Sequence, residues 1–210
     1  MSETISLSIA AHTPIEEVRF SVLDLETTGG APPEHKITEI AAYHVDGLRI
    51  TDEFVTLVNP ERNIPAFITG LTGINEKMVK DMPPSRDVLP NLQSFLGDSI
   101  LVAHHSQFDR RFLENELELM GERPLVNGDL CTSRLARRIV PWLPSKSLGN
   151  LAAFFGISIP DRHRAAGDAY ATSELLIIFL NYLKSRGLDT IDQVMQFQHG
   201  EMPYPTDADD

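Results

Sequence analysis

The chain has 210 residues, of which 42% are hydrophobic, and its formal net charge at pH 7 is −12. This length predicts one domain with a substantial core, and the acidic charge argues against tight, nonspecific coating of nucleic acid. The single cysteine, Cys131, excludes an internal disulfide, and no apolar run is long enough to span a bilayer. The N-terminus lacks the pattern of a signal peptide, so we expect a soluble, cytoplasmic protein without a membrane partner.

Three early strands are followed by alternating strands and helices. Strands are expected at 18–25, 37–45, 50–58 and 99–103, and helices at 85–97, 107–119, 131–139, 147–155, 165–185 and 188–197. Proline, asparagine and glycine residues predict a loop after the third strand. Residues 1–17 are expected to form an arm, and the last residues, 206–210, a disordered acidic tail. The order of elements indicates an α/β fold with a mixed sheet.

Asp24 and Glu26 stand two residues apart near the carboxyl end of the first predicted strand. Residues i and i+2 of a strand point to the same face of the sheet, so both carboxylates project together. Two like charges at this separation repel each other, and burial makes either charge more costly. A divalent cation such as Mg²⁺ or Mn²⁺ would compensate, because it binds paired hard oxygen ligands.

Two further acids and a histidine follow later in the chain. Asp109 falls in the first turn of the helix after strand 99–103, near the sheet edge where open α/β folds place their ligands. Asp168 lies inside a later helix and His163 in the loop before it, and the small residues 165–167 allow that helix to pack closely. Read singly, an acid in the position of Asp109 is more often a helix cap, and a histidine in the position of His163 is more often a surface loop residue.

Together these segments resemble the DEDD superfamily of 3′–5′ exonucleases, in its histidine subclass. The similarity extends to connecting segments typical of bacterial proofreading exonucleases, such as the epsilon subunit of DNA polymerase III. It covers about residues 18–183 and implies a ribonuclease H-like, three-layer α/β fold with a mixed central sheet flanked by helices. Residues 18–185 would form the exonuclease domain, with residues 186–210 as a C-terminal helix and tail. The motifs are Asp24-x-Glu26-Thr27-Thr28-Gly29, His104-x-x-x-Phe108-Asp109 and His163-x-Ala165-x-x-Asp168.

The resemblance implies two divalent cations, Mg²⁺ or Mn²⁺, held by four carboxylates. Asp24 would contact both cations, and Glu26 and Asp168 would hold the one that activates water. Asp109 would support, through water, the cation that faces the leaving group, and His163 would be the general base. Two cations can stabilise both the attacking and the leaving oxygen of an in-line displacement.

The resemblance also implies a substrate site for single-stranded or frayed 3′ ends of DNA, with nucleoside 5′-monophosphates as products. Glu26 and the backbone of Thr27 and Thr28 would contact the terminal 3′ hydroxyl, and Leu25 and Thr72 would pack near the last nucleotide. His163 would also face the substrate, and Gly29 and Gly30 would let the backbone approach it. A 3′–5′ exoribonuclease that trims short RNA is the first alternative. The second is a catalytically silent module that binds nucleic acid or a polymerase.

Two positions give further expectations. His105 stands where the family usually has asparagine. An imidazole nitrogen can still cap the helix that follows, so a local effect is expected, although a shifted helix start would displace Asp109. The stretch Gln193 to Phe197 resembles the short motif with which bacterial replication proteins bind the sliding clamp. The alternative for this stretch is an ordinary amphipathic helix end. A DNA polymerase is the other possible partner.

Overall fold

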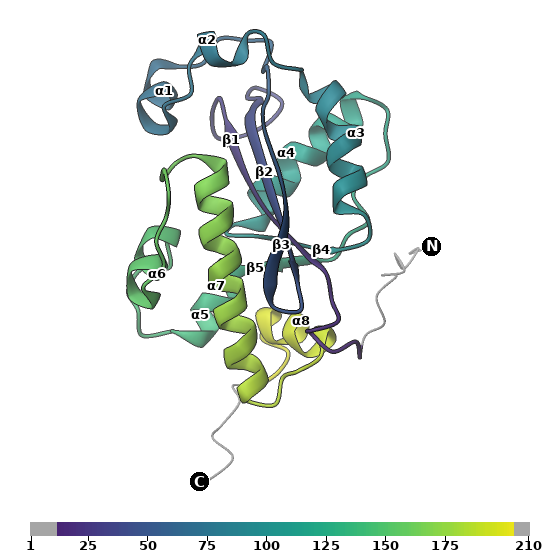
Figure 1. The fold of residues 1–210 in the computed structure, drawn as a ribbon, viewed down its shortest axis with the longest axis vertical. Coiled ribbons are helices and arrows are strands. Elements are labelled where there is room, and N and C mark those ends of the chain that lie inside the picture. Colours follow the sequence, from purple (N-terminus) through teal and green to yellow (C-terminus); the bar gives the residue numbers. More distant parts are fainter. Residues whose placement is uncertain (1–11, 204–210) are drawn as a thin grey trace.

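A mixed sheet of five strands forms the centre of the computed structural model, which describes residues 12–203 (Figure 1). The strand order is β3-β2-β1-β4-β5. β1 pairs with β2 in the antiparallel sense and with β4 in the parallel sense, so the predicted mixed sheet is confirmed. The strands are β1 (Phe20–Thr27), β2 (Ile37–Asp46), β3 (Arg49–Leu57), β4 (Ile100–Ala103) and β5 (Asp129–Cys131).

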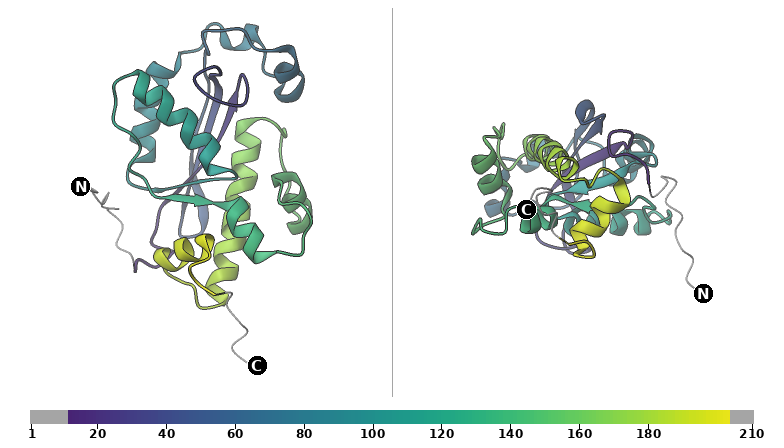
Figure 2. Two further views of the ribbon diagram at one scale, coloured as in Figure 1. Left: turned by 180° about the vertical axis from the view of Figure 1, so that it is seen from behind. Right: turned by 90° about the horizontal axis from the view of Figure 1, so that it is seen from below.

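Helices cover both faces of this sheet and make three layers (Figure 1; Figure 2). α3 (Ser85–Leu96) and α4 (Ser106–Leu119) pack on one face. The other side carries α5 (Thr132–Ile139), α6 (Leu148–Phe155), α7 (Ala165–Ser185) and α8 (Ile191–His199). Within residues 12–203, no helix has the length and hydropathy that a membrane crossing requires.

The alternation of side chains along β1 decides which layer the acidic pair faces. Phe20 and Val22 belong to the core beneath α7, whereas Leu23 and Leu25 belong to the core beneath α3 and α4. A strand turns successive side chains to opposite faces. Asp24 and Glu26 continue the Phe20 and Val22 series and therefore project on the side of α7, as their spacing predicted.

Three short elements were not predicted. β5 has only three residues, and the predicted loop after β3 contains α1 (Ala66–Thr72) and α2 (Glu76–Val79). Elements of three to seven residues carry little periodicity, so their sequence does not reveal them. α1 and α2 pack around a small cluster of isoleucine and valine side chains. They lie at the end of the sheet where β1 ends and α7 begins (Figure 1).

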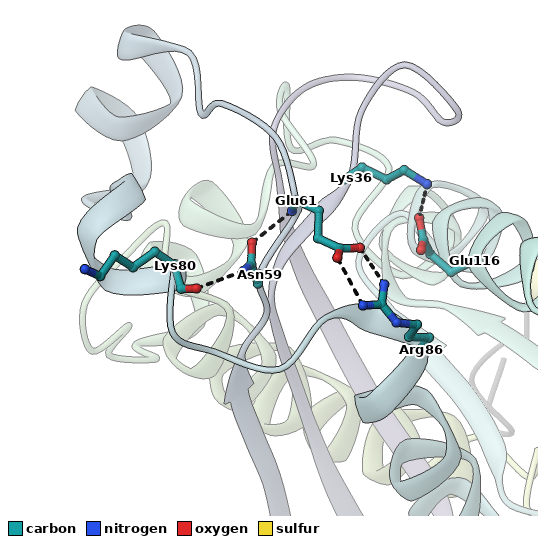
Figure 3. Close-up of polar contacts among 6 residues, drawn as sticks. All are labelled: Lys36, Asn59, Glu61, Lys80, Arg86 and Glu116. Atoms are coloured by element: carbon teal, nitrogen blue, oxygen red, sulfur yellow. Dashed lines mark hydrogen bonds and ion pairs between the residues drawn. The ribbon is translucent and has the colours of Figure 1, made fainter.

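Polar contacts fix the segment that carries α1 and α2 (Figure 3). The Asn59 side chain donates to the carbonyl oxygen of Lys80 at 3.0 Å and accepts from the Glu61 N–H at 2.9 Å. The Arg86 guanidinium of α3 donates twice to the Glu61 carboxylate, at 2.6 and 3.1 Å. All of these contacts are exposed to solvent, so each contributes modestly to holding the loop.

α8 packs into the main core, and the segment before it forms a backbone hydrogen bond with the residues that precede β1. The backbone N–H of Ile15 donates to the carbonyl of Asp189 at 2.9 Å, and Ile15 is buried. Val194 and Phe197 are fully buried, so these apolar side chains of the clamp-like stretch pack in the core, as expected for an ordinary amphipathic helix end. The predictions for residues 1–11 and for the acidic tail lie outside the described residues.

Candidate functional site

Three of the four predicted carboxylates meet where β1 ends and α7 begins. Asp24 and Glu26 project from β1, and Asp168 comes from the first turn of α7. α7 packs directly over this face of β1 and β2, with Ala165 and Ala169 in the contact. One oxygen from each of the three carboxylates lies within 4.8 Å of the others. The arrangement gives a compact cluster of oxygen ligands.

Asp109 reaches the same hollow from the opposite layer. β4 pairs only with the Phe20–Val22 part of β1, so β1 continues beyond the end of β4. α4 begins at this point, and Asp109 lies in its first turn and is buried. The four carboxylates line one hollow of about 390 Å³ together with Leu25. The register of β4 therefore explains how an acid on α4 approaches an acid on β1.

Crowding and burial shift the acids toward their protonated forms. Burial raises the pKa of Asp24 well above its usual range, and the charges of Asp109, Glu26 and Asp168 raise it further. Burial, followed by the charge of Asp168, raises the pKa of Glu26 to about 8. Burial also raises the pKa of Asp109 to about 7, against the opposing effect of backbone N–H groups. The pKa of Asp168 is also raised, again mainly by burial.

This donor set fits divalent cations. Among the described residues, the buried Oδ1 atom of Asp168 has no hydrogen-bond partner. A buried polar atom without a partner is costly, and a cation would supply the missing interaction. Mg²⁺ and Mn²⁺ prefer carboxylate oxygens, which are the only charged groups in the cluster. Asp24, Glu26 and Asp168 could hold one cation, with Asp109 available for a second.

The raised pKa values predict that Mn²⁺ stabilises the protein more at about pH 8 than at about pH 6. The contribution of Glu26 to metal-free stability is present below its ordinary pKa of 4.5 and is lost as the pH rises through about 8. The metal-free protein should therefore weaken across this range, and a cation that binds the ionised carboxylates should reverse the loss. The measurement is the melting temperature with Mn²⁺ or EDTA at both pH values. An equal Mn²⁺-induced shift at both would contradict this linkage.

His163 lies in the segment just before α7, in the left-handed backbone region with φ of 64°. Its backbone N–H donates to Oδ2 of Asp168 at 3.3 Å. The side chain is half-buried, but it is not among the residues that line the carboxylate hollow. The structure thus places His163 next to the site through its backbone.

A buried ion pair between Glu39 and Arg164 was not foreseen. Glu39 stands opposite Glu26 in the pairing of β1 with β2 and is 2% exposed. Its carboxylate accepts two bonds from the Arg164 Nε at 3.0 and 3.2 Å, and the Ala165 N–H donates to it at 2.8 Å. This carboxylate therefore fixes the start of α7, and with it Asp168. The only signal in the sequence is an acid that precedes the apolar run Ile40–Ala42 within one strand.

The predicted substrate residues have mixed positions. Leu25 lines the hollow, whereas the hydroxyls of Thr27, Thr28 and Thr72 are engaged within the protein. Thr27 donates to the Gly29 carbonyl at 2.7 Å, Thr28 accepts from a backbone N–H at 3.0 Å, and Thr72 donates to its own helix at 3.0 Å. An added Cβ at Gly29 would meet a histidine ring at 2.2 Å. The lack of a side chain at Gly29 therefore makes room for the His35 ring, whereas a Cβ at Gly30 would meet no atom within 4 Å.

The two adjacent histidines behave differently. Nε2 of His104 donates to the Lys146 carbonyl at 2.8 Å, and Nδ1 accepts from the Thr132 hydroxyl at 2.9 Å. Burial lowers the pKa of His104 to about 4, so the ring is neutral and ties β4 to α5. His105 forms no side-chain cap on α4. α4 nevertheless begins at Ser106 and keeps Asp109 in its first turn.

Gly167→Ala is expected to lower the free energy of unfolding by about 1–3 kcal/mol. The added Cβ would lie 1.6 Å from the Pro160 carbonyl oxygen, a backbone atom that cannot swing aside. The segment before α7, which includes His163, must then move. Urea denaturation measures the effect. Gly149→Ala is the matched control, because its Cβ meets only the flexible Arg162 guanidinium at 2.8 Å, and we expect a change within about 0.5 kcal/mol.

Known proteins match both the sequence and the fold. The exonuclease family named for RNase T matches residues 21–176. The chain is 38% identical over 178 residues to the PolC-type DNA polymerase III of Caldanaerobacter subterraneus, covering 85% of this chain and 13% of that protein. It is 38% identical over 164 residues to the DNA polymerase III subunit epsilon of Aquifex aeolicus, covering 78% of this chain and 81% of that protein.

A solved structure of exonuclease X in complex with 5′ overhanging duplex DNA superposes with a TM-score of 0.68 at 29% identity, covering 83% of this chain and 99% of that chain. The match confirms the ribonuclease H-like fold class. The chain spans less than a third of the length of the first curated relatives it matches. With a match over residues 21–176 and the three motifs in place, the chain belongs to the exonuclease family.

Proposed function

We propose that this chain is a metal-dependent 3′–5′ exonuclease that releases nucleoside 5′-monophosphates from DNA. The observation that carries the proposal is the convergence of Asp24, Glu26 and Asp168 within 4.8 Å, in a hollow shared with Asp109. The names of relatives at 38% identity support DNA as the substrate. Two structural neighbours that bind histone mRNA or rAMP share only 19% and 20% identity with this chain, so they inform on the fold alone.

Each carboxylate has a role that follows from its position. Two bound divalent cations, Mg²⁺ or Mn²⁺, would supply charge stabilisation for the attacking and leaving oxygens. Asp24 interacts with the charges of all three other acids, which makes it the central ligand. Glu26 and Asp168 would orient the water on one side, and Asp109 would serve the leaving-group side. His163 would accept the proton of the attacking water.

The substrate would be a single-stranded or frayed 3′ end. Leu25 lines the hollow and would contact the last nucleotide, together with Glu26. Because the hydroxyls of Thr27 and Thr28 are engaged internally, these residues would bind the 3′ hydroxyl through their backbone. Thr72 would pack near the last nucleotide, while its hydroxyl donates within α1. The PolC-type and epsilon relatives support association with a DNA polymerase and a cytoplasmic location.

Digestion of matched, 5′-labelled single-stranded DNA and RNA tests this function. With Mg²⁺ or Mn²⁺, the DNA should shorten stepwise from its 3′ end, and EDTA should stop the reaction. Faster digestion of RNA would favour the exoribonuclease alternative. Binding without digestion under every metal condition would favour the silent binding module.

A further inference from the structure

A second hollow, of about 470 Å³, adjoins the carboxylate site. It lies where α4 and α5 begin, directly after the parallel neighbours β4 and β5. His105 and Phe108 line both hollows, so the two are adjacent along the sheet edge. The first turns of both helices present backbone N–H groups that have no partner within their helix. Such helix starts attract anions, and two of them converge here.

Three arginines give this hollow a strong positive charge. Arg111, Arg134 and Arg137 line it, and within residues 12–203 none of them forms an ion pair. The carboxylate of Asp129 is nearby, but it accepts from the Ser106 hydroxyl at 2.9 Å and does not line the hollow. In a chain of net charge −12, three uncompensated guanidinium groups in one place require a structural or functional reason.

A buried hydroxyl supplies an independent sign of a ligand. Ser133 lines the same hollow, is 1% exposed, and in the described part of the chain its Oγ has no hydrogen-bond partner. An unsatisfied buried hydroxyl costs about 1–3 kcal/mol. A ligand with acceptor oxygens would remove that cost. Helix starts, guanidinium groups and a free hydroxyl are all donors, so the matching ligand is an oxyanion.

We infer that this hollow binds a backbone phosphate of the strand whose 3′ end occupies the carboxylate site. The inference rests on the proposed function. Arginine matches phosphate because its planar guanidinium donates two parallel hydrogen bonds. Phe108 is half-buried at the boundary of the hollows, where an aromatic ring can stack against a base. The site would let an enzyme of net negative charge bind the phosphate backbone of strands longer than one nucleotide.

The test compares Arg134→Gln/Arg137→Gln with the control Arg49→Gln/Arg123→Gln. The control arginines are exposed and outside the hollow, and their loss changes the net charge equally. Binding of a labelled single-stranded oligothymidylate is measured by anisotropy in EDTA over a series of salt concentrations. We expect the test variant to bind about tenfold more weakly. The slope of log K against log salt concentration should also be shallower by about 1.4, or about 0.7 for each lost phosphate contact. The control should bind like the unaltered protein.

Hydrolysis of an aryl ester of thymidine 5′-monophosphate separates the two proposals. This substrate fills only the carboxylate site, so the test variant should hydrolyse it at the unaltered rate. Equal oligonucleotide affinity and salt slope in the test and control variants would overturn the inference, as would an effect confined to duplex DNA. If the unaltered protein binds the oligonucleotide but hydrolyses neither substrate with Mn²⁺, the proposed function fails while the binding comparison still stands.

Discussion

Asp168→Asn is expected to reduce metal-dependent digestion by about 10³-fold while the fold is retained. The loss follows from removing a ligand whose Oδ1 has no partner within the described residues. Metal stabilisation of a transition state is worth several kcal/mol, and about 4 kcal/mol corresponds to 10³ in rate. Asparagine keeps the size of the side chain and an oxygen that can accept from the His163 N–H. Asp24→Asn should give a loss of the same order.

The same substitution should make the metal-free protein more stable even though it reduces activity. In EDTA the mutual repulsion of Asp24, Glu26 and Asp168 opposes folding, so Asp168→Asn should raise the melting temperature above neutral pH. Single-turnover digestion and melting curves measure the two effects. Asp87→Asn on α3 is the control, because it removes an exposed charge outside the site. Near-normal turnover in a folded Asp168→Asn protein would refute the metal assignment.

Local periodicity was sufficient to predict the long elements and the acidic pair. The alternation of β1 placed Asp24 and Glu26 on one face, although the strand occupies Phe20–Thr27 instead of 18–25. The small residues at 165–167 predicted close packing at the start of α7, and Gly167 does contact the Pro160 carbonyl there. Each of these features depends on residues that are near one another in sequence, which is the range over which pattern is informative.

Contacts between residues far apart in the sequence could not be predicted from local periodicity. Glu39 and Arg164 are 125 positions apart, and only the packing of α7 on β2 brings them together. β5 has no periodicity of its own and forms because β4 offers it an edge. The clamp-like stretch in α8 is ambiguous in sequence for a related reason. Its apolar side chains are compatible both with a clamp-binding motif and with a place in the core. Phe197 is buried, so its side chain packs in the core.

His163→Asn is expected to reduce digestion by about 10²–10⁴-fold, the usual contribution of a general base. Asparagine is the informative substitution because it tolerates the left-handed backbone, here with φ of 64°. The backbone N–H that holds Asp168 should therefore stay in place. The variant should bind Mn²⁺ normally and regain activity when imidazole is added. His12→Asn, at an exposed position, is the control.

The decisive comparison is with His105, which lines the carboxylate hollow whereas His163 does not. If His163 is the base, its ring must turn into the hollow when substrate binds, and His105→Asn should change the rate by less than tenfold. A loss below tenfold for His163→Asn, with a larger loss and imidazole rescue for His105→Asn, would assign the base to the start of α4. The roles of the carboxylates would stand in either case, because their convergence depends on β1, α4 and α7 and not on either histidine ring.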